Sequence, residues 1–310
     1  MCSGRGGDPA GDCVVANRST VWFAQTKRTK MTVSSKTRSQ RKNFLLDIIL
    51  FVICALLLLP LLLLIANGFK TPQEILVWPP TILPTDPTLE NFQRVFSETP
   101  LFKWIFNSLS FALLSMIAIV ITSTLAGYVV AKFQFWTINV IFTLFLATAI
   151  IPFEVYMIPL YFQVKALGAL NSIGGLLIGY LVMSFGIFLI RQNVIAAVPD
   201  ELIEAARIDG AGEFWIFWHI VVPLLKGPIA ALSVLAFFQA WTTFAWPIVV
   251  LTRKTAFTIE VGLANFQSAY TIDLALLSAA SAAVMVPSVL VFVFLRRSFV
   301  EGIAASGMKE

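Results

Sequence analysis

Apolar stretches of about twenty residues recur along this chain and constrain its fold more than any other feature. Hydrophobic residues make up 58% of the 310 positions and charged residues only 13%. An apolar helix of about twenty residues spans a bilayer, whereas a membrane β-strand needs about ten residues with alternating polarity. The continuous runs therefore predict an all-α integral membrane protein rather than a soluble domain or a barrel.

The apolar runs predict six transmembrane helices. Their expected ranges are about 44–66, 105–130, 138–159, 174–192, 227–250 and 276–296. Before the first run, nine basic residues face two acidic ones, which predicts a cytoplasmic N-terminus under the positive-inside rule. With that orientation, sixteen lysine and arginine residues fall inside and six outside. The C-terminal tail, 298–310, is then cytoplasmic as well.

The basic N-terminal tail, residues 1–43, lacks apolar periodicity and is expected to be largely disordered. Its charge favours contact with anionic lipid over binding of nucleic acid. The run 44–66 is longer than the apolar part of a signal peptide and has no A-x-A cleavage site after it, so we interpret it as a span. The proline-rich segment 67–104 is expected to form short helices and turns on the outer face.

A charged segment separates the fourth and fifth runs. Six charged side chains fall within fourteen residues, namely Asp200, Glu201, Glu204, Arg207, Asp209 and Glu213. At roughly 3 kcal/mol per charge at bilayer depth, inserting them would cost on the order of 15–20 kcal/mol. The segment 193–226 is therefore expected to lie in water on the cytoplasmic side.

Local signals predict a short helix in this segment. Pro199 favours a helix start, and the two acidic residues that follow it complement the exposed N–H groups of a first turn. Gly210 is suited to a left-handed cap. Glu204 and Arg207, three positions apart, can pair. The aromatic run 214–218 then predicts a second helix near the membrane surface.

By itself, such a segment is equally compatible with an amphipathic loop lying on the membrane. Its spacing is more specific, because Glu204-Ala205-Ala206 is followed after three residues by Gly210, and after nine more by Ile220-Val-Val-Pro223. This pattern resembles the cytoplasmic signature loop of permease subunits of ATP-binding-cassette (ABC) importers. The resemblance covers about residues 44–310 and is strongest for the carbohydrate-uptake branch, including the maltose-type second permease.

Shorter matches in the same order support the resemblance. They are Asn107-Ser108, Ile151 to Glu154 with Ile158 to Tyr161, Gly186 to Gln192, and Trp246-Pro247. One departure concerns the fifth run, where related carbohydrate permeases often carry Trp-Asn-Glu-Phe and this chain has Trp241-Thr-Thr-Phe244. The departure leaves the transport role intact and weakens any transfer of substrate preference.

The resemblance implies a coupling helix that docks on a separate ATPase. The residues that would form this contact are Glu204, Ala205, Ala206, Arg207, Asp209, Gly210, Ile220 and Pro223. Gly210 would allow the bend between two short helices, Glu204 would face basic or polar groups of the ATPase, and the two alanines would keep the contact close. The implied partners are two ATPase subunits, a second homologous permease, and an external solute-binding protein docking on 67–104 and 251–275.

No catalytic constellation is visible in the sequence. A G-x-x-x-x-G-K-[ST] phosphate loop is absent, and the single His219 lacks the context of a metal site. We therefore expect a transporter subunit that is not itself an enzyme and holds no cofactor or metal. ATP and Mg²⁺ would bind to the partner ATPase.

Polar and aromatic residues inside the runs are candidates for a solute path, because each costs free energy in lipid unless it faces protein or water. The candidates are Asn107, Glu154, Gln239, Trp241, Thr242 and Thr243. Glu154 ranks first, near the expected outer end of the third run. Structural hydrogen bonding between helices and anchoring in the aromatic belt are the competing interpretations.

The sequence as a whole predicts a permease subunit of an ATP-driven importer in a bacterial-type inner membrane, for a sugar, oligosaccharide or polyol-like solute. The alternative is a secondary transporter or channel for a small polar solute. That class should show internal hydropathy repeats and charges deep in several spans. A purely structural membrane protein would leave the spacing from Glu204 to Pro223 unexplained.

Overall fold

The computed structural model describes residues 46–133, 135–266 and 273–307. Within these ranges all regular elements are helices. The chain divides into two compact units, residues 1–62 and 63–310. The tail expected over 1–43, and residues 308–310 of the expected C-terminal tail, lie outside the described residues.

The described part of the first unit belongs to the helix Leu46–Gly68, which is 23 residues long. Its apolar side chains, such as Phe51 and Leu56, are exposed. A helix that is apolar on all sides is suited to lipid or to packing against other membrane helices.

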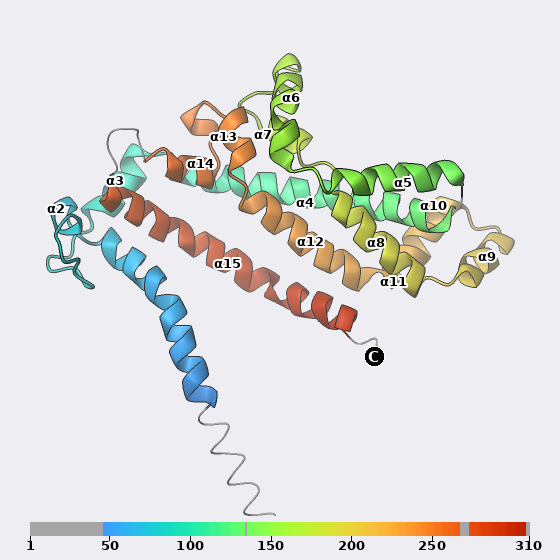
Figure 1. The fold of residues 1–310 in the computed structure, drawn as a ribbon, viewed down its shortest axis with the longest axis horizontal. Helices are drawn as coiled ribbons and strands as arrows, with labels where there is room; N and C mark the ends of the chain where they lie inside the picture. Colours follow the sequence, from blue (N-terminus) through green and yellow to red (C-terminus); the bar gives the residue numbers. More distant parts are fainter. Residues whose placement is uncertain (1–45, 134, 267–272, 308–310) are drawn as a thin grey trace, which may run out of the picture. The chain divides into compact units, whose positions relative to one another are not determined.

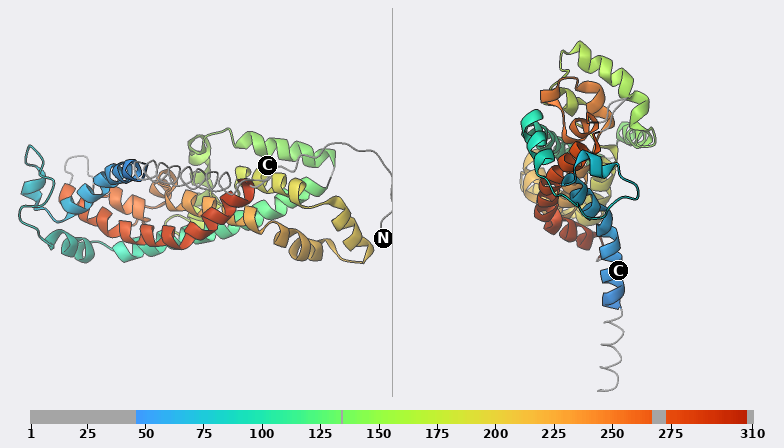
Figure 2. Two further views of the ribbon diagram at one scale, coloured as in Figure 1. Left: turned by 90° about the horizontal axis from the view of Figure 1, so that it is seen from below. Right: turned by 90° about the vertical axis from the view of Figure 1, so that its left-hand side faces the viewer.

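The second unit is built from long helices with short elements at both ends. The longer helices are α4 (Leu101–Lys132), α5 (Trp136–Thr148), α6 (Phe153–Ala166), α8 (Ser184–Ala197), α12 (Lys226–Trp241) and α15 (Leu274–Gly307). The short helix α7 (Ile173–Ile178) precedes α8. The short elements are α2 (Pro72–Ile75), α3 (Glu90–Glu98), α9 (Asp200–Ile208), α10 (Glu213–Ile216), the π-helix η1 (Phe217–Val221), α11 (Val222–Leu224), α13 (Ala245–Val250), the 3₁₀-helix η2 (Lys254–Ala256) and α14 (Ile259–Ala264). Figures 1 and 2 place α3 and α9 at opposite ends of this unit.

Three helices of the described ranges are long and apolar enough to cross a membrane, namely Leu46–Gly68, α4 and residues Leu274–Val293 of α15. The number of candidate spans rises to as many as five if each of two bent helix pairs forms one span. They are α5 with α6, bent by 103°, and Glu213–Leu224 with α12, bent by 82°. Helices thus break inside the expected ranges 138–159, 174–192 and 227–250, and α15 continues beyond 296.

Proline residues accompany two of the helix breaks, and a contact with a distant segment accompanies the end of α7. Pro152 disfavours helical backbone at the residue before it, and α6 begins directly after it. Pro228, in the first turn of α12, cannot donate to the carbonyl four residues earlier and clashes with it, so the preceding helix ends at Leu224. The Leu176 carbonyl, which a longer α7 would use internally, accepts the Trp246 indole N–H at 3.0 Å.

Glycine allows close backbone approach at two of these helices. A Cβ at Gly127 of α4 would lie 2.7 Å from Ile190 Cγ2 of α8, and one at Gly179 would lie 3.0 Å from Trp246 Nε1. Small residues serve such contacts between membrane helices. The long helix α4 is therefore held tightly against α8.

The buried apolar side chains form two clusters. One gathers around Trp104, Phe111 and Trp246. The other joins α4 and α8 and extends into the charged segment, where Ile203 and Ile216 are buried. The short helices of that segment are therefore packed onto the bundle rather than suspended in solvent.

The proline-rich segment 67–104 contains the short helices α2 and α3. Glu74 organises its first half, since one carboxylate oxygen accepts hydrogen bonds from the Thr85 N–H at 2.8 Å, the Thr85 hydroxyl at 2.9 Å and the Thr81 hydroxyl at 3.0 Å. The bond from the Thr85 backbone is the main reason why the pKa of Glu74 is lowered.

Candidate functional site

The helix α9 has the form that the sequence predicts. It begins at Asp200 after Pro199, with acidic residues in its first turn. It closes at Gly210, whose φ is +85°. There the N–H of Ala211 donates to the carbonyl of Ala206 at 2.9 Å, the bond that a left-handed cap provides. A rigid helix of nine residues results.

The α9 helix buries one side and exposes the other. Ile203 is buried against the bundle, whereas Glu204, Ala205 and Ile208 are exposed. A hollow of about 570 Å³ opens beside it, lined by Leu202, Ala205, Ala206, Asp209, Gly210, Ala211, Gly212, Trp215 and Ile220. Five of the eight residues expected to couple to an ATPase therefore line one hollow, and Glu204, Arg207 and Pro223 do not line it.

Arg207 is paired differently from the sequence expectation. Its Nε lies 2.6 Å from Glu213 Oε1, six residues on, while no ion pair with Glu204 occurs in the described ranges. The chain turns back after Gly210, and this brings the first residue of α10 next to Arg207. The Tyr128 hydroxyl of α4 donates to the second oxygen of Glu213 at 3.1 Å. Glu204 is thus left exposed and without an ion pair in the described ranges.

Lys132, the last residue of α4, holds the start of α9. Its ammonium group donates to the Val198 carbonyl at 2.6 Å and pairs with Asp200. The Lys132 side chain is only 8% exposed, compared with 70% for Asp200. In the sequence, Lys132 contributes only to the number of basic residues that predicts the membrane orientation. Nothing in the sequence links it to a residue 68 positions away.

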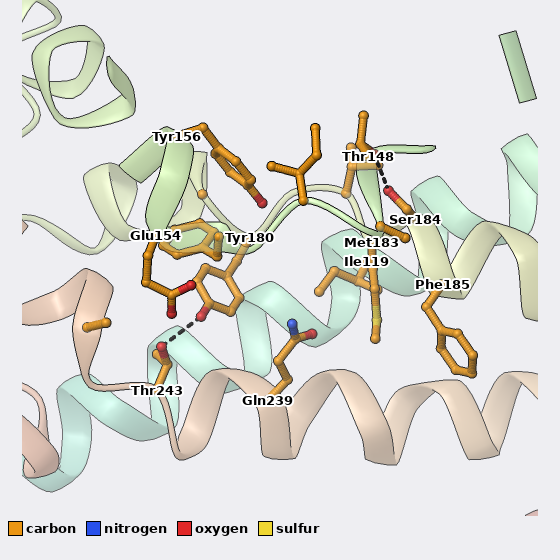
Figure 3. Close-up of a pocket in the computed structure, with 16 residues that line it drawn as sticks. Ile119, Thr148, Glu154, Tyr156, Tyr180, Met183, Ser184, Phe185, Gln239 and Thr243 are labelled. Atoms are coloured by element: carbon orange, nitrogen blue, oxygen red, sulfur yellow. Dashed lines mark hydrogen bonds between the residues drawn. The ribbon is translucent and has the colours of Figure 1, made fainter. Parts of the chain in front are cut away.

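A polar cavity of about 340 Å³ lies where the helices of the bundle break. Three expected path residues line it, namely Glu154 of α6, Gln239 of α12 and Thr243 after α12 (Figure 3). They come from separate elements, and the breaks after α5, α7 and α12 bring them together. Irregular backbone at membrane depth is tolerated where it lines a cavity.

The other three expected path residues do not line this cavity. The Asn107 amide donates to the carbonyls of Thr255 and Phe257 at 3.1 and 3.0 Å. The Thr242 hydroxyl donates to the Phe238 carbonyl at 2.8 Å. Trp241 is buried and stacks on Phe237 with ring centroids 5.7 Å apart. Hydrogen bonding and packing thus account for their contacts.

The sequence analysis missed several polar residues of the cavity. Tyr180 donates to the Thr243 hydroxyl at 2.7 Å, and the hydroxyls of Thr148 and Ser184 lie 2.9 Å apart at the opposite side (Figure 3). Tyr156 also lines the space. Hydroxyl groups within apolar runs were the available signal, but membrane helices commonly use such groups to bond each other.

Comparison with known proteins places these features in a family. The model of the family described as binding-protein-dependent transport system inner membrane component matches residues 123–303. The arabinooligosaccharides transport system permease protein AraQ of Halalkalibacterium halodurans is 33% identical over 270 residues, which cover 86% of this chain and 96% of AraQ. The lactose transport system permease protein LacG of Rhizobium radiobacter is 32% identical over 219 residues, covering 70% of this chain and 79% of LacG.

Solved structures share the fold. A chain of a bacterial ABC transporter involved in the import of the acidic polysaccharide alginate matches with a TM-score of 0.67 at 22% identity, covering 84% of this chain and 98% of that one. A second structure, the alginate ABC transporter in complex with an alginate pentasaccharide-bound periplasmic protein, matches with a TM-score of 0.58 at 14% identity. From the family model and the similarity to AraQ together, the chain belongs to the binding-protein-dependent transport system inner membrane components, the permease subunits of ABC importers.

Proposed function

We propose that this permease couples to a separate ATPase through the loop 199–223 and carries a sugar, oligosaccharide or polyol-like solute. The observation that carries the proposal is α9, a short helix closed by left-handed Gly210 and buried on one side at Ile203. Such a helix can act as a lever, because it presents Glu204 outward while its other side is fixed to the bundle.

The ATPase contact follows from the surface of this loop. Ala205 and Ala206 carry no side chain beyond Cβ, so another protein can approach the helix backbone closely. The neighbouring exposed residues Ile208, Phe214 and Trp215 add apolar area, which is typical of the core of a protein interface. Glu204 supplies a single charge for a basic or polar partner group.

The proposed topology has six crossings with both termini in the cytoplasm. The helices Leu46–Gly68, α4 and α15 would each cross, as would the bent pair α5 and α6. The broken stretches α7 with α8, and α12 with α13, would supply the other two. The excess of basic residues in the segments placed inside supports this orientation.

The solute class is inferred from the relatives and from the cavity. Relatives include permeases for arabinooligosaccharides, lactose and sulfoquinovosyl glycerol by name. The cavity lining offers the carboxylate of Glu154, the amide of Gln239 and several hydroxyls, with no lysine, arginine or histidine. These groups can donate and accept hydrogen bonds with the hydroxyls of a polyhydroxylated solute.

The transport cycle would be alternating access. ATP binding on the partner subunits would close the ATPase pair, and α9 would move together with the ATPase surface that it contacts. The helices around the cavity would then change the side of the membrane to which the cavity opens. This chain has no phosphate loop, so it would supply the path and the lever and would not hydrolyse ATP. A second permease and an external solute-binding protein would complete the importer.

The direct test is purification of the tagged permease in mild detergent, followed by mass spectrometry of the proteins that copurify. The wild type should retain an ATPase with a phosphate-loop sequence, and Glu204→Lys should lose it. Glu90→Lys makes the same charge change at an exposed position of α3, at the other end of the unit, and should retain the ATPase. Loss of the ATPase from both variants, or from neither, would contradict the assignment of Glu204.

A further inference from the structure

The helix α4 is hydrogen-bonded at one end to the residues 254–259. Trp104 Nε1 donates to the Lys254 carbonyl at 2.7 Å, and Ser108 Oγ accepts the Ile259 N–H at 2.8 Å. Asn107 lies between these two and bonds the carbonyls of residues 255 and 257. One face of the first two turns of α4 therefore bonds four of the six residues 254–259.

The other end of α4 is bonded to the segment that carries α9. Lys132 binds the Val198 carbonyl and Asp200, at the start of α9. Tyr128 binds Glu213, and the same carboxylate binds Arg207 near the end of α9. The two anchors hold both ends of α9, so α9 can neither slide nor rotate against α4 without breaking one of them.

Between these ends α4 is continuous. It comprises 32 residues with no internal proline, whereas α5 and α6 bend by 103°, α12 meets its preceding helices at 82°, and α15 contains Pro287. Helix kinks arise mostly at proline and similar interruptions. The close contacts of Gly127 with Ile190 and of Ser123 with Gly186 lie one turn apart on α4 and fix its C-terminal part against α8. A displacement at one end is thus delivered to the other.

We propose that α4 transmits the movement of α9 across the membrane to the loop 254–259, and that Tyr128 and Lys132 are the positioning residues that connect it to α9. The inference rests on the proposed coupling function of α9. The movement of α9 is then not transmitted only through α8 and α12, the helices that flank the loop 199–223 in sequence. It is transmitted also through side-chain bonds to a helix more than sixty residues earlier.

Two features make these bonds suited to transmission. Lys132 is almost fully enclosed, and hydrogen bonds to charged groups are stronger than neutral ones, so the contact does not readily exchange with water. Tyr128 is also buried, with its ring against Phe133 and Phe217. The hydroxyl that binds Glu213 is therefore held on a fixed ring.

The test places a reporter at the far end of α4. The native cysteines Cys2, Cys13 and Cys54 are replaced by serine, and Arg253→Cys introduces one thiol beside the loop 254–259, where the side chain is exposed. The purified permease with its copurified ATPase is labelled with a maleimide, with and without a nonhydrolysable ATP analogue and Mg²⁺. Tyr128 lies about 30 Å from Ser108 along α4, from a rise of about 1.5 Å per residue, so no direct contact links the variants to the reporter.

The inner variant is Tyr128→Phe with Lys132→Met, which removes the bonds and keeps the side-chain bulk. Its matched control is Tyr161→Phe with Lys165→Met, the same two changes four positions apart on α6, because the control hydroxyl and ammonium have no bonds to the described residues and Lys165 is exposed. We expect the analogue to change the labelling rate in the wild type and in the control. In the inner variant, the rate should stay at its nucleotide-free value while the ATPase is retained.

The outcomes separate this inference from the proposal on which it rests. A full nucleotide-dependent change in the inner variant would overturn transmission through α4 and leave the coupling role of α9 standing. Failure of the wild type to copurify an ATPase would overturn both. Loss of the change in the control as well as in the inner variant would overturn the specific role of Tyr128 and Lys132.

Discussion

The hydroxyl of Tyr128 and the carboxylate of Glu213 lie 3.1 Å apart, although 85 positions separate them in the chain. This bond joins the long helix α4 to the turn after α9, and Arg207 shares the same carboxylate at 2.6 Å. The Glu204 side chain is consequently free of the pairing that its spacing from Arg207 suggests. The contact makes the exposed helix α9 part of a braced structure.

The left-handed conformation of Gly210 predicts a position-specific effect of alanine. A Cβ at Gly210 would meet no atom within 4 Å, so only backbone strain at φ +85° opposes it. Gly210→Ala should therefore destabilise the end of α9 by roughly 1–2 kcal/mol. Hydrogen exchange of the Ala211 amide should become faster by the corresponding factor.

Gly212→Ala is the matched control for this change. Gly212 is also open within 4 Å, but its φ is −75°, which alanine adopts freely. Exchange of the same amide should be nearly unchanged in this variant. Equal effects of the two alanines would show that the left-handed cap does not hold the end of α9.

Close packing between α4 and α8 predicts a steric effect at Gly127. An added Cβ would lie 2.7 Å from Ile190 Cγ2 and 3.0 Å from the backbone nitrogen of Arg191. Overpacking of this kind typically costs about 1–3 kcal/mol, so Gly127→Ala should lower the midpoint of thermal unfolding in detergent. Gly174→Ala, whose Cβ would approach only the Ser172 hydroxyl at 3.8 Å, should leave the midpoint near the wild-type value.

The hydrogen bonds of Glu74 predict a pH-dependent loop. Because its pKa is lowered in the folded protein, ionised Glu74 contributes stability that is present above its unfolded pKa and lost as pH falls through the folded value. The protection of the Thr85 amide, normalised to its intrinsic exchange rate, should therefore decrease on acidification below the ordinary pKa of a Glu side chain, about 4.3. In Glu74→Gln the protection should be weaker and should not vary with pH in that range, and an identical acid response would assign the effect to another group.

The cavity contact between Tyr180 and Thr243 predicts a measurable energetic coupling. Their hydroxyls lie 2.7 Å apart on segments 63 positions apart. Tyr180→Phe and Thr243→Val should each destabilise the fold by about 1 kcal/mol, and the double variant by less than the sum. The free energies of unfolding in detergent of the wild type, the two single variants and the double variant give the coupling energy. Thr242→Val, which removes a bond to a carbonyl of its own helix, should add to Tyr180→Phe independently.

Local structure was predictable where neighbours in sequence determine it. Pro199, the acidic first turn and Gly210 define α9 by helix-capping chemistry that acts within a few residues. Their expected geometry is present in the structure. The apolar runs likewise predict helices, and three helices of the described ranges are long and apolar enough to cross a membrane, or up to five if each bent pair is one span.

Contacts between distant segments could not be predicted in the same way. The Trp246 indole reaches the Leu176 carbonyl near the end of α7 from 70 positions away, and the bonds of Lys132 depend on where α8 ends. Of the expected path residues, Glu154, Gln239 and Thr243 meet at the cavity, whereas Asn107 fixes a loop. All four are polar residues in apolar surroundings. Only the tertiary arrangement therefore distinguishes residues that line the cavity from a residue that hydrogen-bonds a loop.

Crosslinking in native membranes can detect a contact between α9 and an ATPase. A photoreactive maleimide is attached to Ala205→Cys in a background with the native cysteines replaced, and it crosslinks to the nearest protein. Ser97→Cys, at an exposed position of α3, is the control. We expect position 205, and not position 97, to crosslink to a protein bearing a G-x-x-x-x-G-K-[ST] phosphate loop. Crosslinks from position 205 that reach lipid or other proteins and never such an ATPase would contradict it.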